Sequence, residues 1–247
     1  MTTIENDVPN EKPPNENPIV LRLSDVSFGT SGESGIRLNR LTMTLRQGDL
    51  VMIHLDRSVK VRETVSLFEG LVQPFEGTVR FEQNDWLGED FDRHFKMRSR
   101  IGRVFENDAW IQNLNVAENV TLARRHHRIE PESIDTDLTA WRTRFDVENV
   151  LDQRPAFVEP STLQVYQWIR SLISKPRLLL LERPMQSVSP SRYTTLVDTL
   201  NEVRMTGTAV VWFTSNPVDA SDQIAAPQFH YMLANGQLVE REGVSKP

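Results

Sequence analysis

Two short runs of purely apolar residues most constrain the fold of this chain, at positions 178–181 and 209–213. Runs of this length are typical of strands that are buried on both faces of a sheet. Between them, apolar residues recur at helical spacing over 193–203, and Gly207 ends that helix. Another helical face, over 165–173, leads into the first run. A strand, a helix and a second strand in this order predict a parallel βαβ unit.

The N-terminal part is rich in predicted strands. Short apolar or alternating runs lie at 19–23, 41–45, 50–53 and 78–81. Val61, Val65 and Phe68 form a helical stripe, so a helix is expected to follow the strand at 50–53. Residues 1–18 are rich in Pro, Asn and Glu, and they are expected to form a disordered tail outside the fold.

The middle of the chain differs in character from both ends. From about 115 to 173 it carries charged helical stretches with few strand signals, which predicts a helical subdomain. Trp141, Trp168 and Trp212 are expected to lie in the core. Near the C-terminus, Asn235-Gly236 between two strand-like runs predicts a hairpin.

Composition excludes several classes of protein. The 247 residues suffice for a substantial core, and the absence of cysteine removes thiolate chemistry and fits a cytoplasmic protein. The net charge of −6 argues against a nucleic-acid partner. The longest apolar runs are far too short to cross a bilayer, so no direct membrane insertion is expected.

Three segments resemble the ATP-binding cassettes of ABC transporters. GLVQPFEGTVRF at 70–81 is similar to the stretch after the family's phosphate-loop helix, and IGRVFENDAWIQNLNVAENVTL at 101–122 is similar to its Q-loop region. The segment RPAFVEPSTLQVYQWIRSLISKPRLLLLERPMQSVSP at 154–190 matches the family's signature, Walker B and D-loop block without gaps. The resemblance extends over about 20–243.

The resemblance implies an α/β fold of the P-loop NTPase type. An ABC-cassette-like domain would span 19–247, with a core and an antiparallel β-layer formed by 19–106 and 171–247. An inserted helical subdomain would occupy 107–170.

The phosphate loop implied by the resemblance lacks its chemical residues. A loop of the form GxxxxGK[ST] needs glycines to close backbone N–H groups on phosphates, a lysine for charge and a hydroxyl for Mg²⁺. The equivalent segment is LDRSVKVR, from 55 to 62. Shifting it by one residue puts Lys60 at the lysine position but does not restore the glycines. At the equivalent nucleotide-site positions stand Leu55, Ser58, Lys60, Val61 and Arg62.

The other motifs are replaced as well. Glu182 stands for the Walker B aspartate, and Arg183 for the catalytic glutamate, although a guanidinium cannot act as a base. The aromatic that stacks on adenine is at best Phe28, and otherwise Thr30 replaces it. The remaining positions are Glu106 for the Q-loop glutamine, Val158, Glu159, Pro160, Ser161 and Thr162 for the signature, Ser189 for the D-loop aspartate and Ser215 for the switch histidine.

These replacements predict a cassette that no longer hydrolyses ATP, with no catalytic residue, no metal site and no bound cofactor. Because a buried carboxylate needs a partner, Arg62 and Glu182 are expected to pair directly, with the guanidinium in place of the metal. One alternative is a working ATPase in which Glu182 holds Mg²⁺ and Lys60 or Arg62 supplies positive charge. Another is a free-standing scaffold derived from a cassette.

The resemblance also implies partners. The chain would dock on a membrane permease at the inner face of the cell membrane and pair with itself or with another cassette. The resemblance is to cassettes that serve lipid, lipoprotein or hydrophobic-compound transport. Trp110 and Ile111 follow the Q-loop, where the family receives a helix of the membrane subunit, so Trp110 is either an anchor or a packing residue. The histidines and arginines at 124–128 are expected to be solvated surface.

Overall fold

The computed structural model describes residues 17–29, 37–55, 61–88, 90–107, 109–216, 229–234 and 237–240. Several predictions fall outside these ranges and stay predictions. They concern the tail up to residue 16, Thr30, Ser58, Lys60 and the two turn residues Asn235-Gly236. The antiparallel pairing of Phe229–Ala234 with Gln237–Glu240 confirms the hairpin around that turn. Asn17 and Pro18, predicted to lie in the tail, instead form hydrogen bonds with Gln47.

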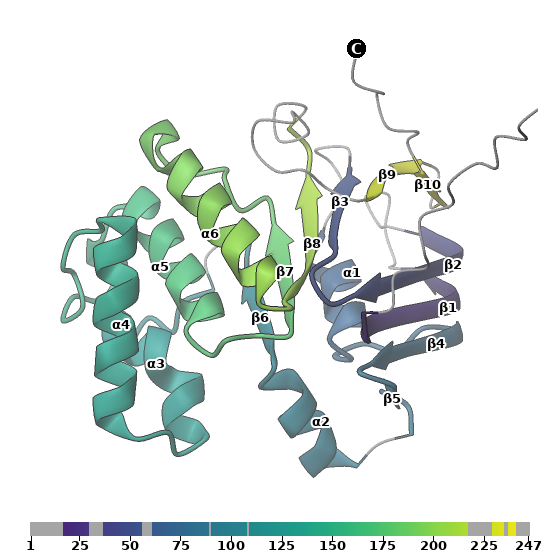
Figure 1. Cartoon of the computed structure of the whole chain (residues 1–247), viewed down its shortest axis with the longest axis horizontal. Coiled ribbons are helices and arrows are strands. Elements are labelled where there is room, and N and C mark those ends of the chain that lie inside the picture. Colours follow the sequence, from purple (N-terminus) through teal and green to yellow (C-terminus); the bar gives the residue numbers. More distant parts are fainter. Residues whose placement is uncertain are drawn as a thin grey trace, which may run out of the picture.

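A six-stranded sheet forms the centre of the molecule (Figure 1). Its order is β10-β9-β3-β8-β7-β6, and every neighbouring pair is parallel except β9 and β10. The strands are β3 (Leu50–His54), β6 (Ile101–Val104), β7 (Leu178–Glu182), β8 (Ala209–Thr214), β9 (Phe229–Ala234) and β10 (Gln237–Glu240). Helix α6 (Tyr193–Met205) connects β7 to β8, which confirms the predicted βαβ unit.

A second sheet is antiparallel, with the order β2-β1-β4-β5. Its strands are β1 (Ile19–Gly29), β2 (Arg37–Arg46), β4 (Glu76–Phe81) and β5 (Asn84–Asp85). Helix α1 (Val61–Phe68) lies between the two sheets, and its apolar face shares one core with both of them (Figure 1). The antiparallel β-layer and the helix after β3 are therefore confirmed.

Helices cover the other side of the central sheet (Figure 1). They are α3 (Val116–His126), α4 (Pro131–Phe145), α5 (Pro160–Leu172) and α6, with short 3-10 turns η1 (Pro155–Phe157) and η2 (Pro190–Arg192). Helix α2 (Phe91–Arg98) precedes β6, and its buried Met97 belongs to the core on the α1 side of the sheet. A second core joins α3, α4, α5 and α6 to this sheet. Trp168 and Trp212 are fully buried as predicted, whereas Trp141 packs against that core with part of its surface exposed.

Local sequence accounts for where the helices begin. Helix α3 opens with a capping box, in which the Asn115 side chain accepts the Glu118 N–H and Glu118 accepts the Asn115 N–H. Helix α5 opens with Pro160, whose missing N–H costs nothing at the first helical position. None of the helices in the described ranges is long and apolar enough to span a membrane.

Candidate functional site

The candidate site lies where β6 and β7 end beside the first turns of α1. Glu182 is the last residue of β7 and only 2% exposed. Its Oε1 accepts a hydrogen bond of 2.5 Å from Arg103 Nε, on the neighbouring strand β6. The backbone N–H of Glu106 also donates to the Glu182 carboxylate. The Walker B position is thus held by a buried ion pair.

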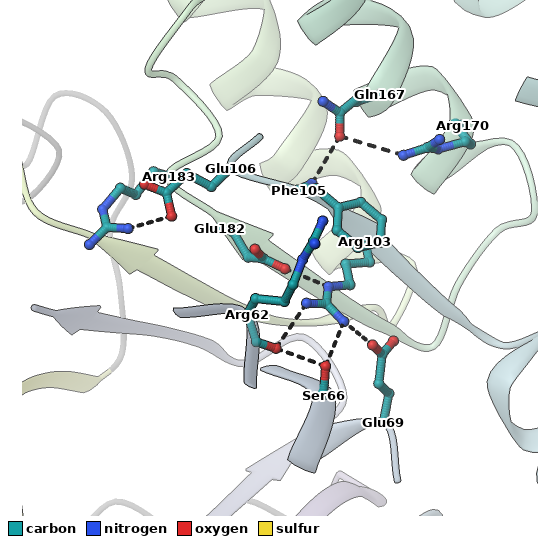
Figure 2. A network of polar contacts seen from close by, with 10 residues as sticks. All are labelled: Arg62, Ser66, Glu69, Arg103, Phe105, Glu106, Gln167, Arg170, Glu182 and Arg183. Carbon is teal, nitrogen blue, oxygen red and sulfur yellow. Dashed lines mark hydrogen bonds and ion pairs between the residues drawn. The ribbon is translucent and has the colours of Figure 1, made fainter. Parts of the chain in front are cut away.

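Arg103 binds four oxygen atoms with one guanidinium (Figure 2). Besides Glu182, it donates to the Glu69 carboxylate, to Ser66 Oγ at 3.3 Å and to the Arg62 carbonyl oxygen at 3.0 Å. The last three acceptors all belong to α1 or to the residue just after it. We call Arg103, Glu182, Glu69, Ser66 and the Arg62 carbonyl the arginine cage.

Arg62 does not pair with Glu182, so that prediction is wrong. The Arg62 side chain is exposed and lies over the Phe105 ring, 5.7 Å from its centroid, as Figure 2 shows. Its charge still acts on Glu182, but Arg103 makes the contact. The physical reason is strand order: β6 lies directly beside β7, so a side chain from β6 reaches the Glu182 carboxylate first. A charged residue within an otherwise apolar strand was the signal for Arg103.

Burial governs the charges of the arginine cage. Desolvation raises the pKa of both Glu182 and Glu69, while the Arg103 guanidinium opposes the shift in each. The Glu182 charge raises the pKa of Glu69 further. One buried cation therefore serves two carboxylates, and the cage favours taking up a proton more than two exposed glutamates would.

Three further replaced positions form a second cluster. Arg183 Nη1 donates to Glu106 Oε2 at 2.6 Å, and Arg183 Nε donates to Ser215 Oγ at 3.0 Å. The positive φ of 42° at Arg183 turns the chain at the end of β7. A cavity of about 470 Å³ opens beside this cluster, with Gln186 and Tyr193 among its walls. The residues at the positions of the Q-loop glutamine, the catalytic glutamate and the switch histidine are thus joined in one hydrogen-bonded cluster.

The structure leaves the remaining predicted positions apart from these two clusters. Leu55 and Val61 are buried in the core that α1 shares with both sheets. Residues 160–162 form the first turn of α5, Glu159 is its N-cap and makes no side-chain capping bond, and Val158 ends η1. Ser189 is exposed and bonded to Ser191. No hydrogen bond or ion pair among the described residues joins 158–162 or Ser189 to the arginine cage.

The aromatic positions divide by burial. Phe28 is buried and stacks on Phe75 with 6.3 Å between ring centroids. Trp110 is 8% exposed and belongs to the helical core, which fits the packing alternative, whereas Ile111 is 43% exposed. Whether either residue contacts a partner stays a prediction.

The basic run on α3 corrects another expectation. Arg124 is not solvated: its guanidinium bonds Asp137 Oδ2 at 2.5 Å and Ser133 Oγ, both on α4. Its four-residue spacing from Val120 places it on the packed face of the helix. His126 and His127 both contact the Phe95 ring of α2, at 5.0 and 4.6 Å. Within the described ranges, no group of three or more His, Cys, Asp or Glu side chains could hold a metal ion.

Comparison with known proteins shows which fold this architecture has. No family model matches the chain. Solved structures do: a bacterial ABC transporter cassette in dimeric form has a TM-score of 0.79 at 19% identity, covering 90% of this chain and 98% of that one. A nucleotide-free ATP-binding cassette from an ABC transporter has a TM-score of 0.71 at 16% identity, covering 91% and 92%. The chain is an ABC cassette in fold. The predicted P-loop NTPase-type α/β class is thereby confirmed.

Curated relatives of the cassette agree with the fold. A methionine import ATP-binding protein of Acinetobacter baylyi is 20% identical, over 89% of this chain and 63% of the relative. An ergothioneine transport ATP-binding protein of Helicobacter pylori is 19% identical, over 83% and 94%. A molybdate/tungstate import ATP-binding protein of Archaeoglobus fulgidus is 26% identical, over 72% and 70%. The cassette spans about half to two thirds of the first curated relatives it matches.

Proposed function

We propose that this cassette is an ABC transporter subunit whose own nucleotide site is closed to Mg²⁺-ATP, and that it acts structurally or as a regulator. The observation that carries the proposal is the arginine cage. The carboxylate at the end of β7 is the group that would hold Mg²⁺, and here that carboxylate, Glu182, is bound by Arg103. Hard divalent cations need free oxygen ligands, so these residues do not suit a magnesium site as they stand.

Opening the cage would be unfavourable. Withdrawing the Arg103 guanidinium would leave two buried carboxylates without their cation, and breaking a buried ion pair costs about 3–5 kcal/mol. Binding of Mg²⁺-ATP would have to supply that free energy before any gain in affinity. The cage therefore acts as an internal substitute for the cation.

The second cluster supports the same conclusion for chemistry. Arg183 has no proton-accepting lone pair with which to activate water. The neighbouring Glu106 carboxylate forms an ion pair with Arg183, so it is not free to act as a base in its place. Pro160 lacks the N–H that a phosphate-binding helix start would offer.

The names of the curated relatives favour a different candidate, a working ATPase, because each is described as an ATP-binding protein. In that case Glu182 would bind Mg²⁺, and Lys60 or Arg62 would supply positive charge to the phosphates. The two candidates make opposite demands on Glu182: it is a structural partner of Arg103 in one and a metal ligand in the other.

Steady-state phosphate release from ATP separates them. We expect no rate above background for the purified cassette, and the same background for Glu182→Gln. The matched control is Glu202→Gln, which removes an exposed carboxylate far along α6. A measurable rate that Glu182→Gln abolishes and Glu202→Gln leaves intact would replace the closed site with the working ATPase.

An apolar surface supports docking on a membrane permease. Ile111 is bonded through its backbone to Asn119 of α3, and residues 119, 122 and 126 lie on one face of that helix. His126 contacts Phe95 of α2, one turn from Phe91, which is 79% exposed. We call Ile111, Leu122, His126, Phe95 and Phe91 the α2–α3 surface.

The α2–α3 surface is suited to a short amphipathic helix. Its exposed side chains come from α2, α3 and the segment before α3, and the ring contact between His126 and Phe95 joins the two helices. A permease bound here would hold the cassette at the inner face of the membrane. Pairing with a second cassette, and a lipid-type cargo, stay predictions. If no membrane protein is isolated with the full chain, the free-standing scaffold replaces this assignment.

A further inference from the structure

Arg170 is a buried cation for which the described carboxylates provide no partner. It stands in the last turn of α5, and burial lowers the pKa of its guanidinium to about 10. Nη1 donates to the Ala109 carbonyl oxygen at 2.6 Å. Nη2 reaches Gln167 Oε1 at 3.5 Å, as Figure 2 shows. These acceptors are neutral, so the charge itself is not balanced. This contrasts with Arg103, which two carboxylates neutralise.

Two aromatic rings hold the Arg170 guanidinium in place. It lies over Trp110, 4.8 Å from the ring centroid, and over Phe105 at 5.5 Å. Stacking on rings fixes the guanidinium plane but does not replace a counter-ion. Arg170 as a whole is partly exposed, although its guanidinium is largely buried. A rigid, poorly hydrated guanidinium that is still reachable is well prepared for one carboxylate.

The position of Arg170 indicates where that carboxylate comes from. The Ala109 carbonyl that it binds is two residues before Ile111, the end of the α2–α3 surface. Trp110 and its unpaired buried Nε1 lie between them in sequence. A partner helix that covers Ile111 with an apolar side chain would bring its next turn towards Arg170 and the Trp110 ring.

We propose that Arg170 receives an aspartate or glutamate side chain from the permease segment that docks on the α2–α3 surface. The inference rests on the proposed docking and adds the charge of the partner to it. A carboxylate bound by a desolvated guanidinium contributes specificity as well as affinity, because a partner with a neutral or basic residue there would leave the cation unpaired.

The test uses the full-length chain in its native cells, with a photo-crosslinking amino acid at Ile111. The crosslinked permease peptide should contain an acidic residue within about one helical turn of the attachment site. Arg170→Met should lower the crosslink yield at least about ten-fold, since it removes the charge but keeps an apolar stem. The matched control is Arg154→Met, at an exposed arginine outside the α2–α3 surface, which should leave the yield unchanged.

A charge exchange makes the test decisive. Changing the identified acidic residue to lysine should abolish crosslinking, and combining it with Arg170→Glu should restore it. Thermal unfolding of each variant checks that the cassette still folds. A crosslink that Arg170→Met does not weaken would overturn this inference and leave docking intact. No permease crosslink with the unaltered Arg170 would overturn the proposed docking, and this inference with it.

Discussion

At the scale of single residues, Arg103 determines the state of the Walker B position, because it binds Glu182. The sequence predicts that Glu182 needs a cation, and the structure provides one from an unexpected strand. The need followed from burial of a carboxylate after four apolar residues. The choice of cation depends on strand order and on side-chain direction, neither of which periodicity encodes. Arg62 and Arg103 were equally available by sequence, and only the pairing of β6 with β7 separates them.

Removing the cation of the cage should be costly. Arg103→Met leaves Glu69 and Glu182 buried and unpaired, so we expect the free energy of unfolding to fall by about 3–5 kcal/mol in urea titrations. Arg100→Met, which breaks an exposed pair with Glu82, should cost less than about 1 kcal/mol. Equal losses in the two variants would show that the cage does not stabilise the fold as described.

The cage should also make stability depend on pH. Both Glu69 and Glu182 have raised pKa values in the folded state, so the folded chain binds protons more tightly than the unfolded chain. Their contribution is fully present below the ordinary glutamate pKa of about 4.5 and is lost as pH rises through the raised values. Glu69→Gln should reduce the fall in the free energy of unfolding between pH 4.5 and neutrality, because one of the two carboxyl groups that cause it is gone. An unchanged slope would contradict the assignment.

At the scale of elements, the packing of β6 on α5 depends on a close approach of their backbones. Strand β6 packs against α5, and a Cβ added at Gly102 would lie 2.3 Å from the Ser171 carbonyl oxygen. The glycine thus allows the contact that positions Arg103.

Helix α2 was not expected, because its residues are mostly charged or polar and only Phe91 and Phe95 form an apolar pair one turn apart. Its start depends on the Asp90 N-cap, which accepts the Arg93 N–H.

A substitution tests the β6–α5 contact. Gly102→Ala should lower the free energy of unfolding by about 1–3 kcal/mol, because the backbone oxygen it meets cannot move aside cheaply. Gly88→Ala is the control, since the nearest atom to its added Cβ is 4.0 Å away. Urea unfolding of both variants gives the comparison. A tolerated Gly102→Ala would mean that β6 can shift away from α5.

At the scale of the whole molecule, the order of strands and helices was predictable and the function of its surfaces was not. Apolar runs at 178–181 and 209–213 specify buried parallel strands, and the structure confirms them as β7 and β8. Surface assignments fail more often because a charge can face solvent or a neighbouring helix. Arg124 illustrates this: only the packing of α3 on α4 brings Asp137 to it.

The docking proposed for the α2–α3 surface can be tested by isolating the cassette from cells together with a membrane partner. Changing Phe91 and Phe95 together to serine should reduce the permease isolated with the cassette, because it removes exposed apolar area that a partner helix would cover. Phe91 is 79% exposed, but Phe95 contacts His126 and His127, so thermal unfolding checks that the double variant still folds. The control is Met205→Ser, at an exposed apolar residue on α6. Undiminished recovery of permease would place the docking site elsewhere.

Calorimetric titration of Mg²⁺-ATP into the purified cassette tests the central claim most directly. With Arg103 held by Glu182 and Glu69, we predict no heat of binding and no rise in thermal stability up to millimolar nucleotide. A ligand present at 100 times its Kd would add about 2.7 kcal/mol of stability, which such experiments detect readily. Saturable binding in the micromolar range would contradict the closed site and show that the arginine cage opens to nucleotide.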